Sequence, residues 1–303
     1  MRDFKVYVAE KPSLGKAIAT VLAKHSPKKD SGREFIAGDD WAVVWAAGHI
    51  FEQNEPDYYL STAYPGAIKS KNSGKIVWTY DHLPLLPGSG DFPGWAIQLT
   101  KDRASLFRTI KTYVSKATIV VNAGDPDREG QLLIDEILDE IKLKPSIPVR
   151  RVLISAIDEH SVQSAINNEK ENSQFSGLKH AALGRSRADW LCGMNYTRAA
   201  TLRAKELGYS GSVVSIGRVQ TPLLGLIAQR DLDIEKFKPT DYYGLVATIA
   251  AQNGTFFARW KPAENQVGLD VEGRLIDRKI AQELQAKIQG KQGTIINYSD
   301  ENK

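Results

Sequence analysis

The order of hydrophobic and polar residues predicts buried strands alternating with amphipathic helices over the first half of the chain. Continuous apolar runs at residues 4–9, 41–47 and 117–123 are typical of buried strands. Apolar residues recur at helical spacing behind two of these runs, at 13–24 and 132–141. Strand followed by helix, repeated, predicts an α/β fold with a parallel or mixed sheet and flanking helices.

One long segment does not fit this alternation. Residues 56–94 are rich in Tyr, Pro, Gly and Ser, and we expect them to leave the sheet as an excursion. Segments of this length inside a compact domain are often functional.

The pattern changes in the second half of the chain. Residues 149–155 predict a last strand, and 158–207 predict an almost entirely helical segment. Residues 242–251 and 255–260 alternate around Asn253-Gly254, which predicts a β-hairpin. A helix over 280–288 and a strand over 294–298 complete the prediction.

Composition indicates a soluble globular protein. The chain has 303 residues, 42% hydrophobic and 25% charged, enough for about two domains. Cys192 is the single cysteine, so neither an internal disulfide nor a Cys/His zinc cluster can form. No signal sequence or membrane-spanning run is recognisable, and we therefore expect a cytoplasmic protein that does not enter a membrane.

Positive charge is concentrated in one stretch. Lys and Arg number 40 against 36 Asp and Glu, a net charge of +4. Residues 185–230 hold seven Lys and Arg against Asp189 and Glu206, so this stretch alone carries +5. The excess is compatible with a nucleic-acid partner.

Carboxylates gather where a predicted strand turns into a helix, in Gly124-Asp125-Pro126-Asp127-Arg128-Glu129-Gly130. Glu10 leaves the end of another predicted strand. In open α/β sheets, ligands bind at the carboxyl ends of strands. Carboxylate oxygens without His or Cys nearby suit Mg²⁺.

A purely structural interpretation of the same loop is also open. Asp125 would cap the helix, Pro126 would occupy its first position, and Asp127 and Glu129 would favour its dipole. A phosphate-binding Walker loop at residues 10–17 is excluded, because Glu10 replaces its first glycine and Ala17 its Ser or Thr. We therefore expect no use of ATP by that route.

The predicted helix over 178–207 brings basic residues together. At about 100° per residue, Arg187, Arg198 and Lys205 form one row, a candidate phosphate track. Arg185 and Asp189 lie four residues apart on the opposite side and can pair or contact a nucleotide. The alternatives are a solvated helix face with one ion pair, or a helix broken at its glycines.

Two further features suit DNA, each with a plainer alternative. Residues 215–220 combine Gly217 with Arg218 and Gln220, a mixture suited to binding phosphates and base edges. The alternative is that these residues only form a tight turn. Trp78, in a polar segment, can stack on an unpaired base or act as a hydrophobic anchor. His49 follows a strand and is by default structural.

Five ordered motifs together resemble the type IA DNA topoisomerases, and among them the bacterial topoisomerase III group. They are Ala9-Glu10-Lys11-Pro12-Ser13-Leu14, Ala47-Gly48-His49, the acidic loop from Gly124 to Gly130, Arg187-Ala188-Asp189-Trp190-Leu191 with Gly193-Met194-Asn195-Tyr196-Thr197-Arg198-Ala199, and Ser215-Ile216-Gly217-Arg218-Val219-Gln220-Thr221-Pro222.

The resemblance implies three domains and a set of site residues. It implies a Toprim domain over 1–155, a helical single-stranded-DNA-binding segment over 156–236, and a truncated start of a β-rich gate domain over 237–303. Glu10, Asp125 and Asp127 would be the Mg²⁺ and acid/base carboxylates, Glu129 an auxiliary, and Lys11 would stabilise the scissile phosphate. His49 would lie close to this site. The implied DNA contacts are Trp78, Arg185, Asp189, Asn195, Arg198, Arg203, Ser210, Ser215, Ile216, Gly217, Arg218, Val219 and Gln220.

The implied activity is cleavage of one DNA strand by a tyrosine, passage of another strand and religation, without ATP. A helicase or a single-strand-binding protein is an expected partner. The family nucleophile belongs to a Tyr-Pro-Arg motif, whereas Tyr-Pro occurs here only at Tyr64-Pro65, before Gly66. We therefore expect an amino-terminal portion of the enzyme, unable to cleave DNA alone.

Two other functions remain open at this point. An autonomous Toprim phosphodiesterase or nuclease would use water in place of tyrosine. A noncatalytic DNA-binding accessory protein would need neither nucleophile nor metal.

Overall fold

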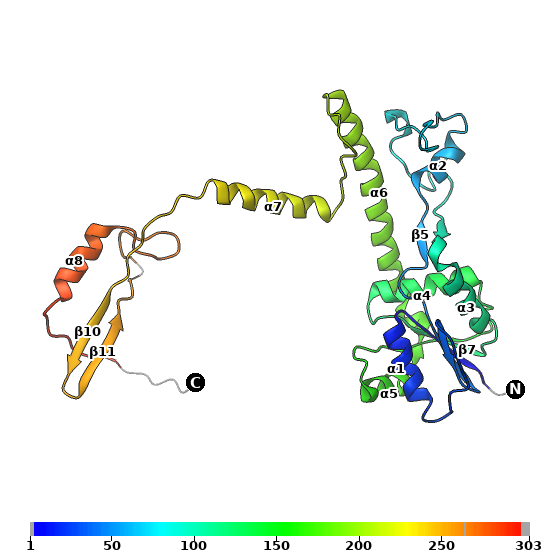
Figure 1. Cartoon of the computed structure of the whole chain (residues 1–303), viewed down its shortest axis with the longest axis horizontal. Coiled ribbons are helices and arrows are strands. Elements are labelled where there is room, and N and C mark those ends of the chain that lie inside the picture. Colours follow the sequence, from blue (N-terminus) through cyan, green and yellow to red (C-terminus); the bar gives the residue numbers. More distant parts are fainter. Residues whose placement is uncertain (1–2, 264, 298–303) are drawn as a thin grey trace. The chain divides into compact units, whose positions relative to one another are not determined.

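A computed structural model describes residues 3–263 and 265–297 of the chain (Figure 1). The chain divides into two compact units, Met1–Leu224 and Gly225–Lys303. No helix among the described residues is both long and apolar enough to cross a membrane.

A seven-stranded mixed sheet forms the centre of the first unit, in the order β2-β3-β4-β1-β7-β8-β9. Its central strands β4, β1, β7 and β8 run parallel, and the edge strands pair antiparallel. This confirms the predicted mixed α/β sheet. The strands are β1 (Lys5–Ala9), β2 (Asp30–Ser31), β3 (Phe35–Ala37), β4 (Trp41–Trp45), β7 (Ile119–Ala123), β8 (Val149–Arg151) and β9 (Lys170–Glu171).

Helices cover both faces of the sheet. On one face, α3 (Ala104–Val114), which follows the 3-10 turn Lys101–Arg103, and α4 (Arg128–Ile141) bury Val6 and Val8. On the other face, α1 (Pro12–Leu22) and α5 (Glu159–Asn167) bury Tyr7 and Val121. Because both faces are covered, the central strands are continuous apolar runs rather than alternating ones.

The predicted excursion leaves the sheet between two short strands. β5 (Phe51–Gln53) and β6 (Ile97–Leu99) pair antiparallel, and the chain between them contains α2 (Pro56–Ala63) and the 3-10 turn Tyr80–His82. The excursion has a small core of Tyr59, Leu60, Ile76 and Leu85, completed by Trp190 from a later helix. It therefore folds with that helix.

That helix, α6 (Ser176–Glu206), is 31 residues long and continues through both of its central glycines, Gly184 and Gly193. It packs against α4 and against the excursion. The predicted helical segment 158–207 is interrupted, because β9 and the 3-10 turn Asn172–Phe175 separate α5 from α6.

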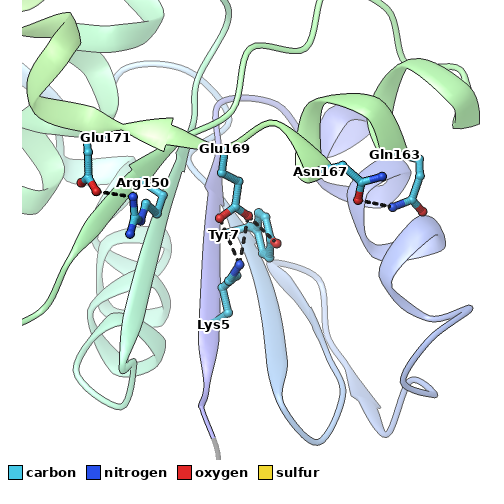
Figure 2. Close-up of polar contacts among 7 residues, drawn as sticks. All are labelled: Lys5, Tyr7, Arg150, Gln163, Asn167, Glu169 and Glu171. Carbon is cyan, nitrogen blue, oxygen red and sulfur yellow. Dashed lines mark hydrogen bonds and ion pairs between the residues drawn. The ribbon is translucent and has the colours of Figure 1, made fainter.

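Polar contacts fasten the connection after α5 to the sheet (Figure 2). The carboxylate of Glu169 accepts hydrogen bonds from Lys5 Nζ at 3.0 Å and from Tyr7 Oη at 3.0 Å. Burial, together with the negative charge of Glu169, raises the pKa of Tyr7 well above its ordinary value. The Tyr7 hydroxyl therefore stays a donor that ties residue 169 to the central strand. Arg150 pairs with Glu171, and Gln163 donates to Asn167 at 3.0 Å.

The second unit contains most of α7 (Gln220–Glu235), a hairpin of β10 (Val246–Ala251) and β11 (Gly254–Arg259), and α8 (Arg278–Ile288). The hairpin and α8 confirm the prediction, and Asp277 caps α8 by accepting from Lys279 N at 2.8 Å. The strand predicted over 294–298 is wrong for residues 294–297, which belong to no strand of the structure; Tyr298 lies outside the described residues.

Glu136 on α4 provides a test of the packing between α4 and α6. Burial, with repulsion from Glu140 and Asp139, raises its pKa to about 7 although Lys179 opposes the shift. The folded state then holds a proton that the unfolded state releases near pH 4.5, so this group lowers stability as pH rises from about 4.5 to 7. We expect Glu136→Gln to raise the free energy of unfolding by about 1 kcal/mol at pH 8 and to leave it unchanged at pH 4.

Urea denaturation at the two pH values measures this difference, with the exposed Glu52→Gln, which does not act on Glu136, as control. An equal effect of Glu136→Gln at both pH values would contradict the assignment.

Candidate functional site

Glu10 and Asp125 meet at the carboxyl ends of two adjacent parallel strands. β1 and β7 are in register at Ala9 and Ala123, so the residues that follow leave the sheet at the same level. The backbone N–H of Asp125 donates to Glu10 Oε2 at 3.1 Å. The structure thus places Glu10, its neighbour Lys11 and Asp125 together, as the strand pattern predicted.

Lys11 lies between the two carboxylates. Its Nζ is 2.5 Å from Asp125 Oδ2 and 3.6 Å from Glu10 Oε1. The hydrogen bond to Asp125, followed by the charge of Glu10, raises the pKa of Lys11, which is therefore a cation at neutral pH. The side chains of Glu10, Asp125 and Lys11 are 15%, 31% and 54% exposed, so an incoming anion can reach the lysine.

Asp127 and Glu129 have different surroundings. Asp127 is the N-cap of α4, and its Oδ1 accepts from Gly130 N at 2.8 Å. The capping interpretation therefore needs correction: Asp127 caps the helix, not Asp125, and Pro126 precedes it. Glu129 lies 3.9 Å from Arg128 Nε. Metal and catalytic roles for Asp127 and Glu129 stay predictions.

Two glycines allow the acidic loop to lie directly on the start of α4. A Cβ on Gly124 would overlap the Gly130 carbonyl group, and one on Gly130 would lie 2.5 Å from the backbone N of Asp125. Both positions therefore require glycine, and the backbone at Asp125 is fixed by this contact.

Arg151, which the sequence did not single out, supports the loop from below. It is fully buried, and its guanidinium donates to the carbonyl oxygens of Gly124 at 2.8 Å and of Asp125 at 2.6 Å. It also donates to Asn122 O and Val152 O. Burial lowers its pKa to about 10, against the charges of Asp135, Asp127, Asp125 and Glu10. The only sequence signal was the pair Arg150-Arg151 inside a predicted strand whose other residues are mostly apolar.

The donor chemistry of the site fits Mg²⁺. Carboxylate oxygens from Glu10 and Asp125 converge on one cation, the ammonium of Lys11. Within the described residues, no three His, Cys, Asp or Glu side chains form a ready metal cluster. Mg²⁺ commonly uses only one or two carboxylates, since waters and phosphate oxygens supply its other ligands.

The predicted row on α6 faces the excursion rather than open solvent. Arg198 is only 7% exposed, its guanidinium lies 4.6 Å from the centroid of Trp78, and its NH1 donates to Met194 O at 3.1 Å. Burial lowers the pKa of Arg198. Arg187 lies 5.2 Å from the Trp95 ring centroid. Aromatic residues of the excursion therefore cover two cations of the row, and Lys205 is its exposed member. A phosphate track along the row stays a prediction.

Asp189 joins α6 to the loop over 215–220. The predicted pair with Arg185 is present, with Nε 3.7 Å from Asp189 Oδ2. Arg218 also binds Asp189 through two nitrogens, one of them 3.2 Å from Oδ2. The hydrogen bond from Arg218 lowers the pKa of Asp189, which is therefore ionised at neutral pH. The sequence could not show this second partner, which lies 29 residues away.

Two threonines of α6, missed in the sequence, hold the chain before Arg218. Thr197 Oγ1 accepts from Ile216 N at 2.9 Å, and Thr201 Oγ1 accepts from Val214 N at 3.0 Å. Farther along the loop, Gln220 donates to Ser215 Oγ at 2.7 Å and Gly217 N donates to Thr221. The loop is thus built against α6, with Val219 exposed.

Asn195 has a clear structural partner. Its Oδ1 accepts from Leu85 N at 2.6 Å, and its Nδ2 donates to Leu85 O at 3.0 Å and Leu191 O at 2.9 Å. It therefore clamps the excursion onto α6, and its predicted contact with DNA remains untested.

The remaining predicted residues are exposed. Arg203 pairs with Glu206 at 3.0 Å, and Ser210 lies beyond the end of α6. His49 is exposed after a left-handed turn at Ala47 (φ 53°) and Gly48 (φ 94°). Gly48 N donates to Glu10 O at 3.3 Å, so this turn borders Glu10.

Comparisons with known proteins agree with this geometry. The Toprim domain family matches residues 5–157, and a DNA topoisomerase family matches residues 173–303. The chain is 41% identical over 298 residues to DNA topoisomerase 3 of Vibrio cholerae, covering 96% of this chain and 43% of the relative. It is 39% identical to that of Salmonella typhimurium, covering 98% and 43%, and 28% identical to that of Bacillus subtilis, covering 96% and 35%. The chain thus spans less than half the length of these relatives.

Arg151 and its neighbour Arg150 form a matched pair for testing the support of the loop. Arg151→Met leaves several buried carbonyl groups without donors, and we expect it to lower the free energy of unfolding by about 3 kcal/mol. Arg150→Met removes one exposed ion pair and should cost less than about 1 kcal/mol. Urea denaturation measures both, and equal losses would contradict the role assigned to Arg151.

Proposed function

The chain belongs to the family of DNA topoisomerases that contain a Toprim domain, and we propose that it provides the Mg²⁺-binding and single-stranded-DNA-binding part of a type IA topoisomerase III. The whole protein would cut one DNA strand transiently, pass another strand and reseal the first, without ATP. The observation that carries the proposal is the convergence of Glu10, Lys11 and Asp125 at the carboxyl ends of β1 and β7.

These residues suit chemistry on a phosphodiester. Glu10 and Asp125 would hold Mg²⁺, with Asp127 as a further ligand, and the metal would supply positive charge to the phosphate. Lys11 is protonated and sits beside the carboxylates, so it can neutralise charge that develops on the phosphate oxygens. A carboxyl group of this set, with Glu129 as an auxiliary, would donate the proton that the leaving 3′ oxygen needs.

Single-stranded DNA would lie along α6 and the loop after it. Trp78 offers a ring to a base, and Arg198 supports that ring from behind rather than holding a phosphate itself. Arg185, Asp189 and Arg218 form one polar group beside them. The other proposed contacts are Asn195, Arg203, Ser210, Ser215, Ile216, Gly217, Val219 and Gln220.

Cleavage by this chain alone is not part of the proposal. Its single Tyr-Pro sequence, Tyr64-Pro65, lies in the excursion, where Tyr64 Oη donates to Asp81 O at 3.2 Å. We further propose action on DNA in the cytoplasm and cooperation with a helicase or a single-strand-binding protein.

The first test incubates the chain with a labelled single-stranded oligonucleotide and Mg²⁺. We expect binding without cleavage, because the sequence contains no Tyr-Pro-Arg motif to supply the family's nucleophile. A mobility-shift assay and a denaturing gel run on the same sample report the two properties. Metal-dependent nicking that tracks with the chain would instead support an autonomous nuclease.

The second test concerns the carboxylates. We expect Asp125→Asn combined with Asp127→Asn to abolish Mg²⁺ binding in calorimetry, since both variants remove charged oxygen donors. Asp39→Asn with Asp40→Asn makes the same change of charge in an exposed turn and should leave binding intact. Undiminished Mg²⁺ binding by the first variant would show that the loop carboxylates do not hold the metal and would support a purely helix-capping role.

A further inference from the structure

The helix α3 and the turn before it form a second concentration of positive charge. Residues 101–116 carry five cations against Asp102, a net charge of +4 that equals that of the whole chain. None of the five forms an ion pair within the part of the chain that the structure describes, although many other lysines and arginines of the first unit do. The cations are Lys101, Arg103, Arg108, Lys111 and Lys116.

The helix separates these charges from its apolar side. Leu106, Ile110 and Val114 are buried in the core, where α3 packs on β4 and β1. Arg108 lies on the opposite side of α3, Lys116 lies just beyond its end, and both are exposed. Because α6 packs on α4 instead, the outer face of α3 is separate from the proposed DNA path along α6.

A groove of about 450 Å³ opens on this outer face, and it combines cations with aromatic rings. The ring centroids of Phe35 and Tyr113 lie 4.9 Å apart, and Lys116 Nζ lies 5.7 Å from the centroid of the Tyr113 ring. Among the described residues, Arg108 donates through its Nε to the carbonyl of Ala104 at 3.3 Å and through neither terminal nitrogen, so these two nitrogens remain for a ligand.

Two carboxylates lie nearby and do not cancel these charges. Glu34 accepts from Thr109 Oγ1 at 2.5 Å, and Asp30 acts on Tyr113, whose pKa is raised by burial first and by this charge second. Within the described residues, these acids act on Thr109 and Tyr113 and form no ion pair with Arg108 or Lys116. The groove therefore presents a guanidinium and an ammonium group beside a pair of rings, with the ammonium group of Lys116 near the Tyr113 ring.

We propose that the outer face of α3 binds a second segment of single-stranded DNA. Arg108 and Lys116 fit successive phosphates, and the rings of Phe35 and Tyr113 offer stacking surface to an unpaired base. A duplex hides its base faces and would use only the cations, and an acidic protein segment would not need the rings. The inference extends the proposed function, because it adds a surface outside the catalytic site and α6.

The test compares two double variants. The α3 variant combines Arg108→Gln and Lys116→Gln, and the control variant combines Lys144→Gln and Lys170→Gln, which removes two exposed charges elsewhere. Binding of 8- and 25-residue oligothymidylates and of a 25-base-pair duplex is measured by anisotropy over a range of salt. For the long strand we expect about tenfold weaker binding by the α3 variant and a salt slope smaller by about 1.4. The short strand, bound along α6, should be unaffected, as should the control variant.

A second pair of variants tests the rings. Tyr113→Phe keeps the ring and should bind the long strand like the unaltered chain, whereas Tyr113→Leu should bind it severalfold more weakly. The inference is overturned if the α3 variant matches the control, if the short strand weakens equally, or if duplex binding falls as much and Tyr113→Leu has no effect.

Failure of the proposed function gives a different result. Arg203→Gln with Lys205→Gln on α6 should weaken both oligothymidylates. If that variant weakens binding of both strands and the α3 variant weakens neither, only the proposal of a second DNA-binding surface is refuted. If neither strand binds the unaltered chain, the proposed function itself fails.

Discussion

The close contact between Gly124 and Gly130 is the constraint on which the site depends. It lets the short loop 124–127 between β7 and α4 fold back tightly, so that the backbone at Asp125 is held against the start of the helix. Arg151 fixes the same backbone from below through the carbonyl groups of residues 124 and 125. With the backbone held on both sides, the Asp125 carboxylate faces Glu10 and Lys11, which directly follow the neighbouring strand β1. A buried arginine is costly in free energy, and here its cost is offset by hydrogen bonds to four backbone carbonyl oxygens, two of them in the acidic loop.

A second consequence follows from the packing of the excursion on α6. Trp190 completes the excursion's core, Asn195 binds the backbone of Leu85, and Arg187 and Arg198 each lie over a tryptophan of the excursion. One face of α6 is therefore used to build the protein, and its basic residues are not all free for DNA. The exposed parts of the proposed interface are displaced toward Asp189, Arg218 and the end of the helix. Thr197 and Thr201 connect these parts by satisfying the backbone of the loop before Arg218.

The sequence predicted the sheet, its flanking helices, the excursion and the hairpin, because each depends on local periodicity or on a turn pair. It also predicted that Glu10 and Asp125 would meet, since residues after adjacent parallel strands share one edge. It did not identify Arg151 or the pairing of Arg218 with Asp189, because both are contacts between distant segments that leave no periodic signal. The sequence also brought Arg187, Arg198 and Lys205 into one row of α6, but helical geometry does not show what packs against each face, and the excursion covers two of the three. The strand expected near residue 295 was wrong, because local β-propensity does not determine which segments join a sheet.

The central claim is that a rigid loop holds Asp125 against Lys11 and Glu10 before any ligand arrives. Nuclear magnetic resonance titration of the Lys11 side chain in the unaltered chain, compared with Asp125→Asn, tests this claim most directly. We expect a Lys11 pKa above the ordinary lysine value, which falls toward that value when Asp125 loses its charge. An ordinary or lowered pKa in the unaltered chain, unchanged by Asp125→Asn, would contradict it.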